Sequence, residues 1–314
     1  MSRVVAGIDC GTNSVRLLVA APVTDETGAV TSLVDLERRM EIVRLGQGVD
    51  RTGRLDPAAL DRTFEALGRY AEVMAGRGVT ATRMVATSAS RDASNAADFV
   101  AGVRDVLGIE PQVISGEQEA ALSYRGATAG IDDALAPSPR LVVDIGGGST
   151  EVVLGRGGSV VASRSVDIGC VRMTERHLAG DPPGAAEVAR TIADIDAALG
   201  LAAEVVPVEQ ARSLIGLAGS VTTVAAIHLG LTEYDPAAIH GHVVPASDVR
   251  AISDDLLGMT HDERAAIGVM HPGRVDVIAA GALVLRRVLD LTGLGAVVVS
   301  EHDILDGIAW SLLE

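Results

Sequence analysis

The stretch at residues 141–154, LVVDIGGGSTEVVL, constrains the fold more than any other part of this chain. Two apolar runs around a short glycine-rich segment predict a β-hairpin. Successive glycines leave backbone N–H groups accessible to a phosphate, and the neighbouring hydroxyls add donors. The alternative is a tight glycine turn with surface acids. The predicted phosphate ligands are Gly146, Gly147, Gly148, Ser149 and Thr150.

Two acids, Asp144 and Glu151, flank this glycine segment. Two carboxylates beside a phosphate would repel it unless a divalent cation lay between them, and hard cations prefer oxygen ligands. The stretch therefore predicts a metal and phosphate site. Asp144 is the first candidate metal ligand, and the expected ion is Mg²⁺ or another divalent cation such as Mn²⁺.

The same pattern occurs near the start of the chain, in residues 5–19, VAGIDCGTNSVRLLV. A constant offset of 135 places Asp9 on Asp144 and Arg16 on Glu151. One repeat at this distance predicts two related domains, each with one phosphate loop facing a shared cleft. Asp9 is therefore a second candidate metal ligand. The predicted phosphate ligands of this first loop are Gly11, Thr12, Asn13 and Ser14.

Composition limits the class of protein. The chain has 314 residues and 48% hydrophobic content, enough for two packed cores. Its net charge of −16 argues against nucleic acid or an anionic membrane as the main partner. No apolar run approaches the roughly 18 to 20 residues that span a bilayer, so a soluble, cytoplasmic protein is expected. Cys10 and Cys170 are too few for a disulfide framework or a zinc site and are expected to be buried reduced thiols.

All 26 basic residues are arginines. The absence of lysine excludes the P-loop lysine of Walker-type NTPases, the protein-kinase lysine and Schiff-base chemistry. An anionic substrate would have to be bound by arginine side chains, backbone N–H groups and a metal ion.

Two further segments carry candidate catalytic side chains. A strand at 83–86 leads into a hydroxyl-rich loop at 87–92, where α/β folds place ligand contacts; Arg91 is the candidate phosphate clamp, and an ion pair with Asp92 is the alternative. Ser115 and Gln118 form a capping box that places Glu119 near a helix start. A carboxylate held there could accept a proton from water, although from these residues alone favourable charge at a helix N-terminus is the favoured explanation.

Four segments, in this order and spacing, resemble the exopolyphosphatase / guanosine pentaphosphate phosphatase family: IDCGTNSVRLL, VATSASRDASN, VISGEQEA and VVDIGGGSTEVVLG. The family lies in the actin-like superfamily of acetate and sugar kinases, heat-shock chaperones and actin. The resemblance implies an α/β fold with two related actin-like domains around a central cleft. The expected domains are residues 1–124 and 125–314, and the terminal helix at 303–313 could pack back on the first.

The resemblance also implies a function. It places the catalytic glutamate on Glu119 and the substrate arginine on Arg91, and Glu151 is the second catalytic candidate. The expected reaction is metal-dependent hydrolysis of the terminal phosphate of inorganic polyphosphate, by water that Glu119 activates. The nearer alternative is a guanosine pentaphosphate 5'-phosphatase; the more distant one is an ATP-binding kinase or a nucleotide-switched module. A homodimer is implied by the resemblance alone.

Other residues leave their roles open. The helix start at 218–223, with its serine and threonines, is a candidate anion site. Arg172 could face the cleft or stabilise a turn. His240 and His242, with His271 further on, lack the spacing of a recognised metal site, and a structural or surface role is favoured.

Overall fold

The computed structural model describes residues 3–129 and 131–313. It divides into two compact units. Unit 1 is the described part of Met1–Gly126 and Ile304–Glu314, and unit 2 is that of Ala127–Asp303. The C-terminal segment thus belongs to the same unit as the N-terminal strands.

Unit 1 is built on a sheet whose described strands have the order β3-β2-β1-β4-β5. The first three strands are antiparallel neighbours, and β1, β4 and β5 run parallel. The strands are β1 (Val5–Cys10), β2 (Ser14–Thr24), β3 (Val30–Ile42), β4 (Ala81–Ala86) and β5 (Gln112–Val113). The helices are α1 (Val49–Thr52), α2 (Pro57–Gly76), α3 (Ser88–Asp92), α4 (Ala96–Leu107), α5 (Gly116–Thr128) and α13 (Ile304–Ser311).

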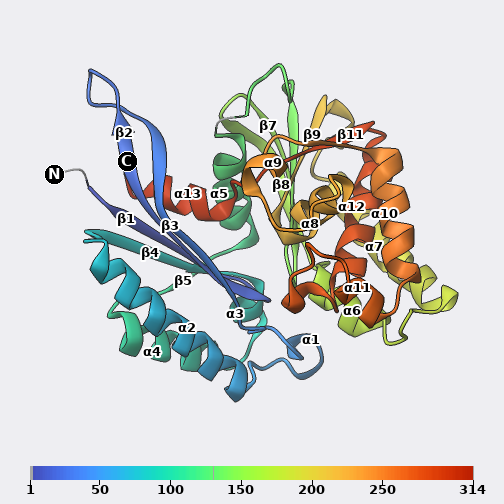
Figure 1. The fold of residues 1–314 in the computed structure, drawn as a ribbon, viewed down its shortest axis with the longest axis horizontal. Helices are drawn as coiled ribbons and strands as arrows, with labels where there is room; N and C mark the ends of the chain where they lie inside the picture. Colours follow the sequence, from blue (N-terminus) through green and yellow to red (C-terminus); the bar gives the residue numbers. More distant parts are fainter. Residues whose placement is uncertain (1–2, 130, 314) are drawn as a thin grey trace. The chain divides into compact units, whose positions relative to one another are not determined.

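Both faces of the unit 1 sheet are covered, which explains why every residue of β1 is buried. Alternate residues of a strand point to opposite faces. Ala6 and Ile8 belong to the apolar cluster formed with α2 and α4, whereas Val5 packs with Leu305 and Ala309 of α13. Figure 1 shows α13 and α2 on opposite sides of these strands. Asp9 alternates with Val5 and therefore lies on the α13 face.

Unit 2 repeats this topology. Its described strands have the order β10-β11-β9-β6-β7-β8, with β6, β7 and β8 antiparallel and β6, β9 and β11 parallel. The strands are β6 (Arg140–Ile145), β7 (Thr150–Arg156), β8 (Ser159–Val166), β9 (Ser213–Leu217), β10 (Val243–Pro245) and β11 (Ala296–Val299). The helices are α6 (Cys170–His177), α7 (Ala185–Ala203), α8 (Ala218–His228), α9 (Pro236–Ile239), α10 (Ala246–Gly258), α11 (His261–Ala265) and α12 (Ile278–Thr292), with 3₁₀ turns η1 (Val208–Gln210) and η2 (Pro272–Arg274).

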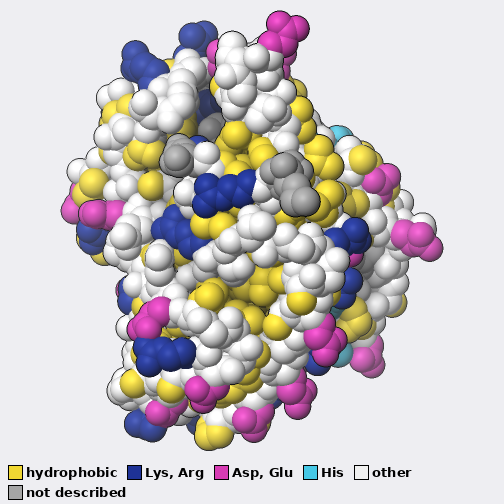
Figure 2. All heavy atoms as spheres, turned by 90° about the vertical axis from the view of Figure 1, so that its left-hand side faces the viewer, with side chains coloured by type: hydrophobic (Ala, Val, Ile, Leu, Met, Phe, Trp, Pro, Cys, Tyr) yellow, Lys and Arg dark blue, Asp and Glu magenta, His cyan; other side chains and the backbone are white. Residues whose placement is uncertain are grey.

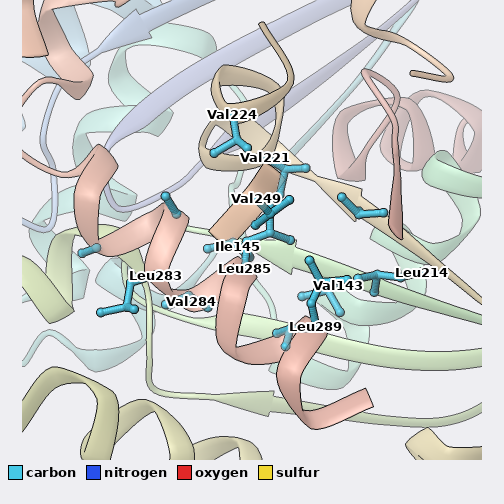
Figure 3. Packing of buried hydrophobic residues seen from close by; sticks show 14 of the residues in the cluster. Val143, Ile145, Leu214, Val221, Val224, Val249, Leu283, Val284, Leu285 and Leu289 are labelled. Carbon is cyan, nitrogen blue, oxygen red and sulfur yellow. The ribbon is translucent and has the colours of Figure 1, made fainter. Parts of the chain in front are cut away.

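The core of unit 2 lies where α8, α10 and α12 cover the sheet. Figure 3 shows Val143 and Ile145 of β6 beside Leu285 and Leu289 of α12. These side chains are at most 4% exposed. Fully burying one such aliphatic side chain contributes roughly 1.5 to 3 kcal/mol. Because Val143 and Ile145 face this core, the intervening Asp144 lies on the opposite face of the sheet.

The predicted repeat is confirmed at the level of individual hydrogen bonds. Strand β6 lies 135 residues after β1 at both of its ends. Each hairpin turn is closed by the same bond, from Gly11 N to Ser14 O and from Gly146 N to Ser149 O, both 3.0 Å long. The two hairpins therefore share one local structure as well as one sequence pattern.

Some local predictions need correction. Asn95 precedes α4 and is a residue type that often caps helices, but its side chain makes no cap. It accepts a hydrogen bond from the backbone N–H of Leu55 at 2.8 Å instead. The apolar helix that follows Arg274 in the sequence begins only at Ile278, after the 3₁₀ turn that Pro272 opens. The hydroxyl-rich loop at 87–92 is largely the short helix α3.

The expectation about the two cysteines is confirmed. Cys10 and Cys170 are buried free thiols, and burial raises the pKa of both. None of the helices in residues 3–129 and 131–313 combines the length and hydropathy needed to cross a bilayer. On the face that Figure 2 shows, the described acidic and basic side chains are interspersed, without a continuous basic area.

Candidate active site

The first phosphate loop, between β1 and β2, keeps its carbonyl groups occupied. Asn13 O accepts hydrogen bonds from Val43 N and Arg44 N, at 3.0 and 2.8 Å. Thr12 O accepts one from Gly46 N at 2.8 Å. Within the described residues, the N–H groups of Thr12 and Asn13 donate to no protein acceptor. The loop thus offers donors, but few acceptors, to an anion.

Side chains hold this loop in place. The hydroxyl groups of Thr12 and Ser88 are 2.9 Å apart and share a hydrogen bond. A Cβ at Gly46 would collide with Cγ2 of Thr12, so only glycine allows this close approach. The loop is therefore anchored to the start of α3, the helix that carries Arg91.

Asp9 is ion-paired within its own hairpin. It lies directly opposite Arg16 across β1 and β2. Arg16 donates to Oδ2 of Asp9 from Nε at 3.0 Å and from Nη2 at 2.6 Å. Asp9 is only 4% exposed. The first hairpin thus neutralises its acid with an arginine.

Glu119 and Arg91 meet in unit 1. The predicted capping box is present, with Ser115 N donating to Gln118 Oε1 at 3.0 Å and Gln118 N to Ser115 Oγ at 3.3 Å. It sets the first turn of α5, where Glu119 is 7% exposed. Nη1 of Arg91 lies 3.2 Å from Oε2 of Glu119. The carboxylate that Arg91 contacts is therefore that of Glu119.

The second phosphate loop, between β6 and β7, uses its carbonyls in the same way. Gly146 O accepts from Cys170 N at 2.9 Å, and Gly147 O accepts from Val171 N at 2.9 Å. These bonds cap the N-terminal N–H groups of α6. In the part of the chain that the structure describes, the N–H groups of Gly147, Gly148 and Ser149 donate to no protein acceptor.

Two neighbours hold the second loop. A Cβ at Gly169 would lie 2.5 Å from the carbonyl carbon and oxygen of Gly147, which leaves room for glycine alone. Nε of Arg172 donates to Gly148 O at 2.7 Å, so Arg172 stabilises the loop. Thr150 also serves the scaffold, because its hydroxyl donates to Ile168 O at 2.7 Å.

Asp144 and Glu151 lie opposite each other across β6 and β7. They are 7% and 1% exposed, and Glu151 accepts a hydrogen bond from Ser165 Oγ at 2.7 Å. The second hairpin therefore has two carboxylates where the first has an acid and an arginine. Such a donor set fits a hard divalent cation whose other ligands are water and phosphate oxygens. Water and phosphate oxygens would be needed, because the described residues contain no cluster of three or more His, Cys, Asp or Glu able to hold a metal ion.

The predicted anion site at the start of α8 includes an arginine that the sequence pattern did not reveal. A Cβ at Gly219 would collide with the guanidinium group of Arg274, so this side chain lies directly over the first turn of α8. Nη1 of Arg274 donates to Thr223 Oγ1 at 3.3 Å. Gly219, which follows a buried strand, was the one local signal for this close approach.

The three histidines singled out in the sequence lie in different surroundings. The rings of His240 and His302 are 4.6 Å apart. His242 contacts His228, at 2.9 Å between ring nitrogens. Nδ1 of His271 accepts a hydrogen bond from Gly273 N at 3.1 Å. His240, His242 and His271 therefore form no common site.

The sequence of this chain is similar to those of known phosphatases. A model of the Ppx/GppA phosphatase family matches residues 23–314. The chain is 49% identical over 320 residues to Exopolyphosphatase 2 of Mycobacterium tuberculosis, and the alignment covers 98% of each protein.

Solved structures of related proteins have the same fold as this chain. The crystal structure of an exopolyphosphatase-like protein has a TM-score of 0.94 and 41% identity, covering 100% of this chain and 99% of the other. The PPX-GPPA enzyme of Aquifex aeolicus has a TM-score of 0.81 and 31% identity, covering 99% of this chain and 100% of that one. The resemblance drawn from the four sequence segments and the α/β fold are thus confirmed, and the chain belongs to the Ppx/GppA phosphatase family.

Proposed function

We propose that this protein is an exopolyphosphatase, which hydrolyses the terminal phosphoanhydride bond of inorganic polyphosphate. The observation that carries the proposal is the contact between Arg91 and the buried carboxylate of Glu119, in the unit that also holds the first phosphate loop. The name of the Mycobacterium tuberculosis relative supports the choice of substrate.

Glu119 is the proposed general base. Its carboxylate would hold the attacking water and accept its proton as the oxygen–phosphorus bond forms and the shortened phosphate chain leaves. Arg91 would donate to oxygens of the terminal phosphoryl group, because its contacts with protein use Nη1 alone among the described residues. Phosphoryl transfer depends mainly on positioning and charge neutralisation, which an arginine and backbone donors can supply.

The two loops are proposed to bind phosphate oxygens through their available N–H groups. Asp144, with Glu151 opposite it, would hold a divalent ion such as Mg²⁺, and Asp9 is the lesser candidate because Arg16 neutralises it. When bound, the ion would neutralise charge on the phosphate oxygens. A polyanion meets repulsion from a protein of net charge −16, so substrate binding should depend strongly on magnesium and salt.

The test is phosphate release with magnesium from long polyphosphate, short polyphosphate, guanosine pentaphosphate and ATP, measured in parallel. Glu119→Gln should lower turnover on polyphosphate by about 100-fold or more, within the range for a general base. Glu117→Gln is the matched control, because Glu117 lies in the same helical turn but is exposed. Unchanged turnover in Glu119→Gln would exclude Glu119 as the base.

The same experiment separates the alternatives. Release from guanosine pentaphosphate alone would assign the site to a 5'-phosphatase, whose substrate presents the same terminal anhydride chemistry. Tight ATP binding with slow hydrolysis would indicate a nucleotide-switched module. Either result would replace the proposed activity.

A further inference from the structure

Three polar side chains form a chain of contacts at the β10 end of the unit 2 sheet, apart from the phosphate loops. His228 is the last residue of α8, His242 immediately precedes β10, and Asp248 lies in the first turn of α10. Nδ1 of His228 is 2.9 Å from Nε2 of His242, and Nε2 of His228 is 3.0 Å from Oδ2 of Asp248. Three separate elements thus bring these groups together.

Two imidazole nitrogens this close must have a proton or a metal ion between them, because two lone pairs would repel each other. A neutral imidazole has one donor and one acceptor nitrogen, so two rings at this distance share either a proton or a metal ion. The neutral form of an imidazole has the lone pair that metal ions bind.

The contact with Asp248 orients the ring of His228, so that Nδ1 faces His242. Oδ2 of Asp248 lies within hydrogen-bond distance of Nε2 of His228, on the side of the ring away from His242. An ionised carboxylate accepts the Nε2–H of His228 and leaves the lone pair of that ring on Nδ1. Histidines that bind metals almost always donate their second ring N–H to such a partner.

We propose that Nδ1 of His228 and Nε2 of His242 bind one divalent transition-metal ion of the Zn²⁺, Ni²⁺ or Cu²⁺ class, with Asp248 orienting His228. Two nitrogen ligands, each about 2.0 to 2.1 Å from one ion, lie roughly 2.9 Å from each other when the angle at the ion is a right angle. At the tetrahedral angle the two nitrogens would be about 0.4 Å further apart. The side chain of His228 is 25% exposed, so the ring can make this adjustment.

The remaining ligands would be water, which the exposure of His228 admits. Imidazole ligands suit these ions, whereas Mg²⁺ prefers carboxylate, carbonyl and water oxygens. The proposed site thus differs in chemistry, as well as in residues, from the carboxylate pair of the second phosphate loop. Binding would link the end of α8, β10 and the start of α10, and would stabilise unit 2 because an ion that binds only the folded state shifts the unfolding equilibrium.

The test is calorimetric titration of the chelator-treated full-length protein with Zn²⁺, in excess Mg²⁺ so that oxygen sites are filled. Wild type should bind one Zn²⁺ saturably at this site and melt at a higher temperature with it. His242→Gln should abolish this binding. His261→Gln is the control, because His261 contacts the carboxylates of Asp262 and Asp276 and should leave binding unchanged.

A second variant keeps both nitrogen ligands. Asp248→Asn should weaken Zn²⁺ binding by about 10- to 100-fold, the usual effect of removing a partner that orients a metal ligand. Circular dichroism of each metal-free variant checks that it folds. Absence of saturable Zn²⁺ binding in wild type, or unchanged binding in a folded His242→Gln protein, would overturn the proposal and leave a hydrogen bond between the two histidines.

Discussion

Arg91 donates from Nη1 to Oε2 of Glu119 at 3.2 Å, across 28 positions of sequence. The same Nη1 donates to Ile114 O at 3.1 Å, so the arginine is held by two acceptors at the start of α5. The proposed phosphate ligand therefore also positions the proposed base. This double role leads to the first prediction.

Arg91→Lys should lower kcat/KM for polyphosphate by about 100-fold, comparable to losing one preorganised donor to transition-state charge. Lysine keeps the charge but loses the planar fork that can bind Glu119 and a phosphoryl group together. Steady-state kinetics of phosphate release measure the effect. Arg104→Lys is the control, because Arg104 forms an exposed ion pair with Glu110. Equal kinetics for the two variants would refute a special role for Arg91.

Gly169→Ala should damage the second loop without removing any group proposed to contact substrate. The added Cβ would lie 2.5 Å from the backbone of Gly147, and overpacking of this kind costs about 1 to 3 kcal/mol. We expect a lower melting temperature and at least about tenfold lower activity. Gly158→Ala, where nothing lies within 4 Å of the new Cβ, should match wild type. Full activity in a destabilised Gly169→Ala protein would separate the loop from catalysis.

Asp144→Asn should raise the Mg²⁺ concentration needed for half-maximal activity by more than about tenfold, because carboxylate charge drives binding of hard cations. Magnesium titrations of polyphosphate hydrolysis measure this value. Asp105→Asn changes an exposed carboxylate of α4 and should leave the titration unaltered. An unchanged magnesium requirement in Asp144→Asn would argue that the ion binds elsewhere.

Glu187 should make stability depend on pH. Hydrogen bonds from the backbone N–H of Gly184, then of Gly180 and Ala179, lower the pKa of Glu187 below its usual value. A lowered folded-state pKa stabilises the protein fully above the unfolded-state pKa, and the benefit is lost as pH falls through the folded-state value.

Glu187→Gln should therefore melt below wild type at pH 7, and the difference should shrink as the pH falls below about 4.5. Thermal melts between pH 3 and pH 7 measure it. The control is Glu209→Gln, an exposed glutamate in η1. A melting difference that stays constant down to pH 3 would contradict the linkage.

Local sequence predicted the elements around the site well. Two apolar runs around a short glycine turn predict a hairpin because the register of a two-strand ribbon follows from its turn. The same locality explains the proline-led start of α2, where Asp56 accepts from the N–H groups of Ala58 and Ala59. Asn95, a residue type that favours the cap position, does not cap α4 because Leu55, 40 positions away, supplies a competing donor.

The sequence by itself determined the repeat, the two hairpins and the position of Asp144 opposite Glu151, since each depends on side-chain alternation or on a turn within a few residues. Only the tertiary structure brought Arg91 to Glu119, laid Arg274 over Gly219 and joined His228 to His242. These pairs lie on separate elements, and their contacts depend on how helices pack on sheets. No local period or turn residue identifies the partner in these pairs.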